Sequence, residues 1–181
     1  MDKETVIRVD NLKKSFKDNE VLKGVNFRVK AGEVFGLLGS NGAGKTTTVR
    51  ILATLTTMGA GDVKVCGYDL HRQPNKVREV ISLTGQYAAV DEMLTGRENL
   101  ILVANLRRLK NYKEKIDELL ELFDLTKSAD KLVKTYSGGM KRKTDIAMSL
   151  LGDPKIIFLD EPTTGLDPQS RLKLWDMIKE L

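Results

Sequence analysis

Residues Gly39 to Thr46 read Gly-Ser-Asn-Gly-Ala-Gly-Lys-Thr and match the pattern G-x-x-x-x-G-K-[ST]. Glycines at these positions let backbone N–H groups turn inward around phosphate groups, while a following helix directs its positive end at them. In such a loop Lys45 reaches the outer phosphates of a nucleotide and the Thr46 hydroxyl binds Mg²⁺. The context fits, because the apolar run Val34 to Leu38 predicts a strand before the loop and a helix is expected from Lys45 to about Leu55.

Two adjacent carboxylates supply the complementary chemistry. The apolar run Ile156 to Leu159 is followed directly by Asp160 and Glu161. Such a run predicts a central parallel strand covered on both faces, which delivers the carboxylates to the sheet edge where ligands bind. There Asp160 would hold the Mg²⁺ shell, and Glu161 would orient or deprotonate the attacking water. Alone, two acids after an apolar run often mark only a strand end; beside the phosphate loop they predict nucleotide hydrolysis.

An α/β domain must position these groups. Further short strands are expected at Val6 to Val9, Gly24 to Val29, Val63 to Val65 and Ile81 to Leu83. After Gly96 the apolar period changes to that of an amphipathic helix, as at Ile116, Leu119, Leu120 and Phe123. The segment Arg97 to Lys134 is therefore predicted to be a helical insert, and another helix is expected after Ser137, as far as Leu151.

The last predicted helix has a clear start and no stop. Asp167 is expected to cap it and Pro168 to be its first residue. The pattern continues to Leu181 without a terminating glycine or proline. We therefore expect the C-terminus to be truncated inside its domain.

The composition excludes several classes of protein. With 181 residues, 41% apolar and 30% charged, the chain is typical of one soluble globular domain. The longest apolar run, Leu100 to Ala104, is far shorter than the roughly 20 residues that cross a bilayer, and Met1 to Thr5 do not begin a secretory signal. The single Cys66 excludes an internal disulfide and a cysteine zinc site, and the single His71 excludes a multi-histidine metal site.

The net charge of +5 is confined to one segment. Residues 97–143 hold twelve Lys and Arg against seven Asp and Glu, whereas the remaining residues balance. This pattern fits either a solvated helical face or a surface that meets an acidic partner or anionic lipid headgroups. A nucleic-acid surface is not favoured, because no aromatic residues interleave with the basic ones in a base-stacking pattern.

Further motifs resemble those of ATP-binding cassette (ABC) proteins, in the same order and spacing over essentially the whole chain. The segment Tyr136 to Met140, Tyr-Ser-Gly-Gly-Met, resembles the family's signature motif, and Gln86 lies where the glutamine of the Q-loop belongs. Thr164 to Asp167 resembles the D-loop, and Phe16 lies where an aromatic residue stacks on adenine. The variant signature most resembles the ATPase subunits of daunorubicin-resistance-type drug exporters.

The resemblance implies an α/β P-loop NTPase fold of ABC type, with a mostly parallel core sheet, an N-terminal antiparallel β part and an inserted helical subdomain. Residues 1–181 would form a single ABC ATPase domain, with the nucleotide-binding core at 1–96 and 144–181 and the helical signature subdomain at 97–143. The residues expected to bind ATP are Phe16, Gly39, Ser40, Asn41, Gly42, Ala43, Gly44, Lys45, Thr46 and Thr47. The expected catalytic residues are Glu161 and Gln86, and the expected Mg²⁺ ligands are Thr46, Gln86 and Asp160.

The resemblance also implies partners. Ser137 opens a helix, so that its hydroxyl and the following N–H groups form a second anion site. In the family that site faces the nucleotide of a second copy in a head-to-tail, ATP-dependent dimer, and the expected contacts are Ser137, Gly138, Gly139 and Asp167. A transmembrane permease subunit is the other expected partner, which places the chain in the cytoplasm on the inner face of the cell membrane. The implied activity is ATP hydrolysis that powers efflux of a hydrophobic, drug-like compound, and no nucleic-acid partner is expected.

Three features depart from the family pattern. Phe16 stands where tyrosine is commoner; it keeps the stacking surface but loses a hydroxyl, and a core aromatic is the alternative. Met140 replaces a frequent glutamine. The switch residue, usually histidine, belongs after the strand that follows the last helix, where the chain has already ended. We therefore expect this chain to bind ATP and to hydrolyse it poorly.

Two other classes of function stay open as alternatives. A soluble ABC ATPase acting on ribosomes or DNA usually carries a second cassette or a long coiled-coil insert, and this sequence shows neither. A P-loop enzyme that phosphorylates a small metabolite would leave Gln86 and Ser137 to Gly139 unexplained. A phosphoryl-acceptor assay that releases only free phosphate would argue against the second.

Overall fold

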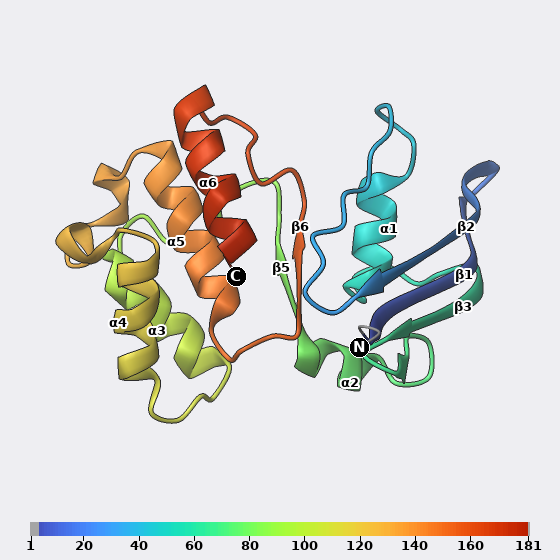
Figure 1. The fold of residues 1–181 in the computed structure, drawn as a ribbon, viewed down its shortest axis with the longest axis horizontal. Helices are drawn as coiled ribbons and strands as arrows, with labels where there is room; N and C mark the ends of the chain where they lie inside the picture. The colour runs from blue at the N-terminus through green and yellow to red at the C-terminus, as the bar shows by residue number, and fades with distance from the viewer. Residues whose placement is uncertain (1–3, 181) are drawn as a thin grey trace. The chain divides into compact units, whose positions relative to one another are not determined.

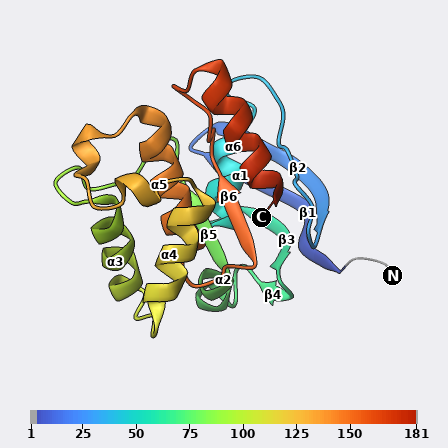
Figure 2. The ribbon, with the colours of Figure 1, turned by 60° about the vertical axis from the view of Figure 1, so that its left-hand side comes forward.

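The computed structural model describes residues 4–180 and divides the chain into two compact units, with the boundary between Ser82 and Leu83. The first unit is built on an antiparallel sheet, and the second is mainly helical (Figure 1; Figure 2). None of the helices within residues 4–180 is long and apolar enough to cross a bilayer.

The sheet of the first unit is antiparallel throughout. Its strands are β1 (Thr5–Phe16), β2 (Asn19–Lys30), β3 (Ala60–Val65) and β4 (Tyr68–Asp69). They lie in the order β2-β1-β3-β4, and each neighbouring pair is antiparallel. Ile7 and Val9, two residues apart, are both buried on one face of the sheet, as the period of two predicts. The predicted N-terminal antiparallel part is confirmed.

Two helices complete the first unit, α1 (Lys45–Leu52) and α2 (Pro74–Val80). Helix α1 starts where the sequence predicts and buries Thr48, Ile51 and Leu52. It ends earlier than the predicted Leu55, because the backbone at Thr54 turns to a φ of 61°, outside the helical region. The start of α1 is tightly packed: a Cβ atom added to Gly44 would lie 2.5 Å from Leu22 of β2.

The predicted strand at Val34 to Leu38 is wrong for this structure. The segment is assigned to no strand and pairs with none of the strands β1 to β4. A strand requires a hydrogen-bonded neighbour, and apolar character alone does not provide one within this unit. Phe35 instead stacks on Phe27 of β2 with ring centroids 5.1 Å apart, and Leu38 is 95% exposed.

The second unit combines two paired strands with a helical core. Its elements after β5 (Ile81–Thr84) are α3 (Gly96–Leu106), α4 (Tyr112–Leu122), η1 (Thr126–Ser128), η2 (Val133–Thr135), α5 (Gly138–Leu150), β6 (Ile156–Leu159) and α6 (Pro168–Glu180). Strands β5 and β6 form a two-stranded sheet and run in the same direction (Figure 1). This pair is the parallel part of the core sheet in the described structure.

The helical insert has the core that its periodicity predicts. Helices α3, α4 and α5 contact one another, and Figure 2 shows them gathered together. The side chains of Ile116, Leu119, Leu120 and Phe123, the residues with helical spacing, are all at most 3% exposed. They pack with Leu100 and Ile146 in one apolar cluster. The predicted helical subdomain is therefore present as α3 and α4, joined to α5 by two short 3-10 turns.

Strand β6 lies where the sequence predicts it, but it is less covered than predicted. Only Phe158 is buried, whereas Ile156, Ile157 and Leu159 are half-buried. A central strand of a parallel sheet is covered by helices on both faces, and three half-buried residues out of four show that β6 is not covered to that extent within the described residues. Its strand neighbour in the described sheet is β5.

A capping box begins α3 and gives a testable stability difference. The Thr95 hydroxyl accepts a hydrogen bond from the Glu98 N–H at 3.1 Å, and the Glu98 carboxylate accepts one from the Thr95 N–H at 2.8 Å. We expect Thr95→Ala to lower the free energy of unfolding by about 1 kcal/mol, because a helix N–H loses its acceptor. Urea unfolding measures this difference. Thr95→Ser keeps the hydroxyl and is the control; equal losses in both variants would contradict the capping role.

Candidate nucleotide-binding site

The phosphate loop of the first unit has the backbone that its glycines predict. Gly42 and Gly44 have φ angles of 84° and 87°, in the left-handed region that a side chain disfavours. The Lys45 ammonium donates hydrogen bonds to the carbonyl oxygens of Gly39 at 2.8 Å and Ser40 at 2.9 Å. These bonds hold the cation over the loop that precedes α1.

The N-terminus of α1 favours an anion. Gly44 is its N-cap and provides no side-chain hydrogen bond, and the first turn contains no acidic residue. The first N–H groups of a helix have no acceptor inside the helix, and they concentrate the positive end of its dipole. Residues 39–43 are exposed, so that an anion from solvent can reach this end. The loop, the ammonium of Lys45 and the helix end together form a cradle suited to phosphate groups.

The second unit brings two predicted catalytic residues into contact. Gln86 follows β5 and Glu161 follows β6, and the paired strands end side by side, since the Asp160 N–H donates to the Thr84 carbonyl at 3.0 Å. The Gln86 Nε2 amide donates to Glu161 Oε2 at 3.2 Å, and the Thr164 hydroxyl donates to the same oxygen at 3.1 Å. The Glu161 carboxylate is therefore held by two donors from separate segments of the chain.

Glu161 also has an unusual backbone. Its φ is 50°, which places a residue other than glycine in the left-handed region. Such a conformation costs of order 1 kcal/mol and is enriched at functional sites. The turn is closed by a hydrogen bond from the Thr164 N–H to the Glu161 carbonyl at 3.1 Å. Eight other non-glycine residues within 4–180, among them Thr54 and Asp153, also have a positive φ, so this angle alone does not single out Glu161.

Two further predicted residues cap neighbouring helices. Ser137 is the N-cap of α5, and its hydroxyl accepts from the Met140 N–H at 3.2 Å. Asp167 accepts from the backbone N–H groups at the start of α6, including that of Ser170 at 3.0 Å, as the sequence predicts. Hydrogen bonds from the Ser170 side chain and backbone hold the pKa of Asp167 below its usual value. The two helix starts are close, because a Cβ atom added to Gly139 would lie 3.5 Å from the Ser170 hydroxyl.

Phe16 lies at the end of β1 and is 49% exposed, so that it is not a core residue. The Lys14 ammonium lies 5.0 Å from the centre of its ring. A cation on one ring face is a favourable contact, and an exposed ring offers a flat surface for stacking. The role of Phe16 toward adenine stays a prediction.

The donor set that was predicted for Mg²⁺ fits that ion. A hydroxyl (Thr46), an amide oxygen (Gln86) and a carboxylate (Asp160) are hard oxygen ligands, which Mg²⁺ prefers. Within residues 4–180 there is no group of three or more His, Cys, Asp or Glu side chains that holds a metal by itself.

The sequence reasoning missed a buried ion pair beside the Gln86 and Glu161 segments. Arg142 and Asp145 of α5 are each only 5% exposed, and their side chains are 3.2 Å apart. Their spacing in the sequence indicates such a pair, because oppositely charged residues three positions apart lie side by side on a helix. Both also lie among apolar residues that the helical period turns toward the core, such as Ile146.

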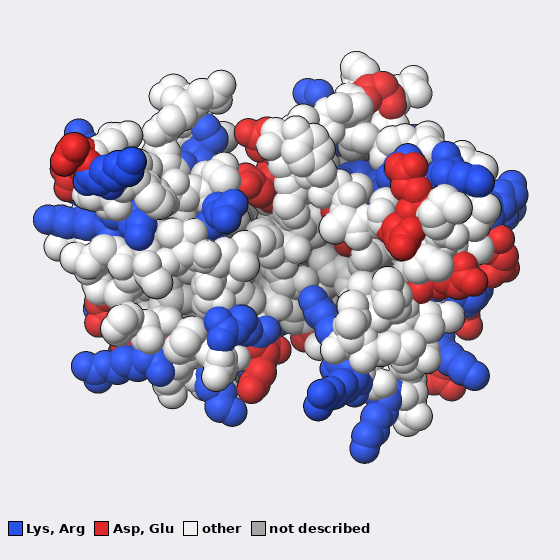
Figure 3. All heavy atoms as spheres, turned by 180° about the vertical axis from the view of Figure 1, so that it is seen from behind, with Lys and Arg blue, Asp and Glu red and all other residues white. Residues whose placement is uncertain are grey.

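The basic segment has a mixed surface. Figure 3 shows Lys and Arg side chains interspersed with Asp and Glu side chains on the face that it draws. Several cations of the segment are paired, since Arg97 contacts Asp117 and Asp130, and Lys115 contacts Asp153. Both interpretations of the segment, a solvated face and a partner surface, stay open.

The comparisons with known proteins agree with these motifs. The model of the ABC transporter family matches residues 22–164. The chain is 48% identical over 180 residues to the daunorubicin resistance ATP-binding protein DrrA3 of Streptomyces coeruleorubidus, over 98% of this chain and 57% of that protein. It is 47% identical over 180 residues to the daunorubicin/doxorubicin resistance ATP-binding protein DrrA of Streptomyces peucetius, over 97% of this chain and 54% of that protein. The chain thus spans about half the length of these relatives.

A solved structure agrees at the level of the fold. The cbiO1 protein of Clostridium perfringens, described as part of the ABC transporter complex cbiONQ, matches with a TM-score of 0.90 and 26% identity. The match covers 98% of this chain and 74% of that one. The predicted fold class, a P-loop NTPase of ABC type, is confirmed, as is the predicted likeness to daunorubicin-resistance ATPases. Because the family match runs from residue 22 to residue 164, and so across every motif from Gly39 to Glu161, this chain belongs to the ABC transporter family.

Proposed function

We propose that this chain is the nucleotide-binding subunit of an ABC exporter, which binds ATP with Mg²⁺ and hydrolyses it. The observation that carries this proposal is the contact between Gln86 and Glu161 at the ends of β5 and β6, 3.2 Å long. A phosphate loop alone supports binding. A carboxylate held by two donors next to a second acid supports hydrolysis, because a general base must be held in place.

ATP binding is assigned to the first unit. The backbone N–H groups of Gly39 to Thr47 and the positive end of α1 attract the phosphates, and Lys45 adds a charge-assisted hydrogen bond to the outer ones. Phe16 stacks on the adenine. Mg²⁺ would neutralise negative charge on the phosphate oxygens, and the residues of this chain that would hold it are Thr46, Gln86 and Asp160.

Hydrolysis is assigned to the residues that follow the paired strands. Glu161 accepts a proton from the attacking water. The water oxygen adds to the outer phosphorus of ATP as the bond between that phosphorus and the bridging oxygen of ADP breaks, so that ADP leaves. Thr164 and Gln86 keep the Glu161 carboxylate in one orientation through their hydrogen bonds. Phosphoryl transfer depends mainly on such positioning and on electrostatic stabilisation.

A second copy of the chain is the proposed partner for the start of α5. Ser137 caps that helix, and its first two residues, Gly138 and Gly139, have no side chains. The exposed N–H groups there form an anion site for the outer phosphate of a nucleotide on the other copy. Asp167 caps the adjacent start of α6 and contributes to the same contact. In this proposal ATP joins two copies head to tail, and its hydrolysis releases them.

The transport role rests on the relatives. Proteins that are 47% and 48% identical to this chain are named for daunorubicin resistance, and the cbiO1 protein belongs to a multi-subunit transporter complex. We infer a separate membrane permease as partner, export of a hydrophobic, drug-like compound, and a place on the cytoplasmic face of the cell membrane. These names favour an exporter over a soluble ABC ATPase that acts on ribosomes or DNA.

The test is co-expression of the full-length protein with its candidate permease. We expect the two proteins to purify together and the ATPase rate, measured as free phosphate, to rise severalfold relative to the protein without the permease. Inside-out vesicles should then take up daunorubicin in the presence of MgATP but not of MgADP. Neither association nor stimulation would overturn the transport role, and phosphate appearing on a small acceptor would favour a kinase instead.

A further inference from the structure

The buried Arg142 side chain links three segments of the second unit. Its Nε donates to the Pro162 carbonyl at 2.8 Å, and its Nη1 donates to the Gly85 carbonyl at 2.6 Å and to Asp145 at 3.2 Å. Asp145 in turn accepts from the Ala89 N–H at 3.1 Å. Helix α5 therefore holds the segment 85–89 and the turn after β6 through a single pair of side chains.

The positions of these contacts point to the site. Gly85 immediately precedes Gln86, and Pro162 immediately follows Glu161. A guanidinium group is planar and presents its donors in a fixed fork, so that it sets the distance between two acceptors. One rigid group thus holds the backbone next to each of the two side chains that meet at 3.2 Å. At the surface, Gln86 and Glu161 are exposed, and the Thr164 hydroxyl is the other donor to the Glu161 carboxylate, at 3.1 Å.

Stability alone is a weak reason for such a pair. Burial lowers the pKa of Arg142 and raises the pKa of Asp145, which shows that both charges are removed from water at a cost. Their mutual attraction opposes both shifts, and the Asp160 carboxylate also stabilises the charged form of Arg142. Apolar residues of similar volume are often at least as stabilising as a buried ion pair. The pair is therefore better explained by the positions in which it holds the segment 85–89 and the turn at Pro162.

We propose that Arg142 and Asp145 are positioning residues for ATP hydrolysis, which hold the segment 85–89 and the turn at Pro162 so that Gln86 and Glu161 stay in contact. The inference rests on the proposed ATPase function and goes beyond it, because neither residue belongs to a nucleotide-binding motif. Both act through the two side chains that they place. Misplacement of a reacting group by about 1 Å costs on the order of 100-fold in rate, so the effect is measurable.

The experiment measures steady-state hydrolysis of MgATP by the full-length protein, unchanged and with each substitution. We expect Arg142→Met and Asp145→Asn to lower kcat by about 10- to 100-fold and to change the KM for ATP by less than about twofold. Arg142→Lys keeps the positive charge but lacks the forked arrangement of donors of a guanidinium group. Its kcat should therefore lie between the kcat of the unchanged protein and that of Arg142→Met. Arg97→Met is the control, because Arg97 also pairs with two aspartates, Asp117 of α4 at 2.6 Å and Asp130 after η1 at 3.2 Å, but at the surface of the unit. It should leave kcat unchanged.

A double-mutant cycle separates positioning from a merely structural role. In a Gln86→Ala background, Arg142→Met should lower kcat by a smaller factor than it does in the unchanged protein, because one of the two side chains through which it acts is already gone. Full additivity of the two losses in kcat would overturn the inference. So would an unchanged kcat per folded molecule in both Arg142→Met and Asp145→Asn. If Arg142→Met does not fold, the same cycle is measured with Arg142→Lys and with Asp145→Asn. An unchanged full-length protein that hydrolyses no ATP would overturn the proposed function itself, and the inference with it.

Discussion

Glu161→Gln lowers the kcat of ATP hydrolysis by about 100- to 10,000-fold, the usual contribution of a general base, and leaves MgATP affinity within about threefold. Gln has the shape of Glu, and its side-chain oxygen still accepts from Gln86 and Thr164, which hold Oε2 at 3.2 and 3.1 Å. What the variant loses is the ability to take a proton from water. Single-turnover phosphate release and equilibrium binding of ATP measure the two quantities separately.

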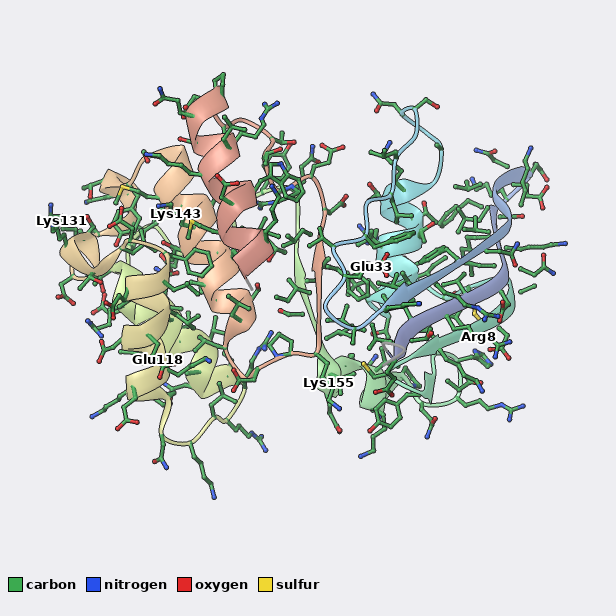
Figure 4. All side chains as sticks on the ribbon, viewed as in Figure 1. Arg8, Glu33, Glu118, Lys131, Lys143 and Lys155 are labelled. Carbon is green, nitrogen blue, oxygen red and sulfur yellow. The ribbon has the colours of Figure 1, made fainter. Side chains whose placement is uncertain are left out.

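The same chemical change at another position is the control. Glu118 lies on α4 of the same unit (Figure 4). Its side chain is 69% exposed. Glu118→Gln should leave both the rate and the affinity unchanged. A rate loss of less than about tenfold in Glu161→Gln would contradict the assignment of Glu161 as general base, since that is far below the usual contribution.

A chain that binds ATP without hydrolysing it also tests the role of the α5 start. Analytical ultracentrifugation of Glu161→Gln should show a dimer with MgATP and a monomer without it. Ser137→Arg places a long side chain at the N-cap of α5 and should abolish the dimer while ATP still binds. A Glu161→Gln chain that binds ATP and never dimerises would leave Ser137 as an ordinary helix cap, and the two-copy proposal would then fail.

The parts of the structure that the sequence predicts well are those with local causes. The loop at Gly42 and Gly44 requires left-handed backbone, which glycine alone adopts easily, and both angles are found. The start of α6 follows from the side chain of Asp167, which accepts the hydrogen bonds expected of an N-cap. The helical period of Ile116 to Phe123 needs no partner to be recognised, because it is a property of one helix face.

The parts of the structure that the sequence does not predict depend on contacts between residues that are distant in the sequence. Val34 to Leu38 has the composition of a strand, but a strand also needs a neighbour to accept its hydrogen bonds, and composition does not say which segment that is. The contacts of Arg142 with Gly85 and Pro162 join residues that are 57 and 20 positions away. No pattern within one helix predicts backbone carbonyls as the partners of a buried guanidinium.

The second large effect concerns binding. Lys45→Ala should weaken the affinity for MgATP by about 10- to 100-fold, because a hydrogen bond to a charged group contributes roughly 1.5–3 kcal/mol and each 1.4 kcal/mol is tenfold. The Lys45 ammonium now donates to two loop carbonyls at 2.8 and 2.9 Å, so that it already lies over the phosphate cradle. Isothermal titration calorimetry with MgATP measures the loss. Hydrolysis should fall further, since the same cation stabilises charge in the transition state.

A comparison of nucleotides distinguishes this role from a general effect of charge. Lys45 is assigned to the outer phosphates, so its loss should weaken ATP binding much more than AMP binding, because AMP lacks those phosphates. Lys64→Ala removes the same charge from an exposed position on β3 of the same unit and should change neither affinity. Equal losses of affinity for ATP and AMP would mean that Lys45 stabilises the loop through its hydrogen bonds to Gly39 and Ser40 and does not bind the outer phosphates. The ratio of the two affinities, and not the loss of ATP binding alone, therefore decides what Lys45 does.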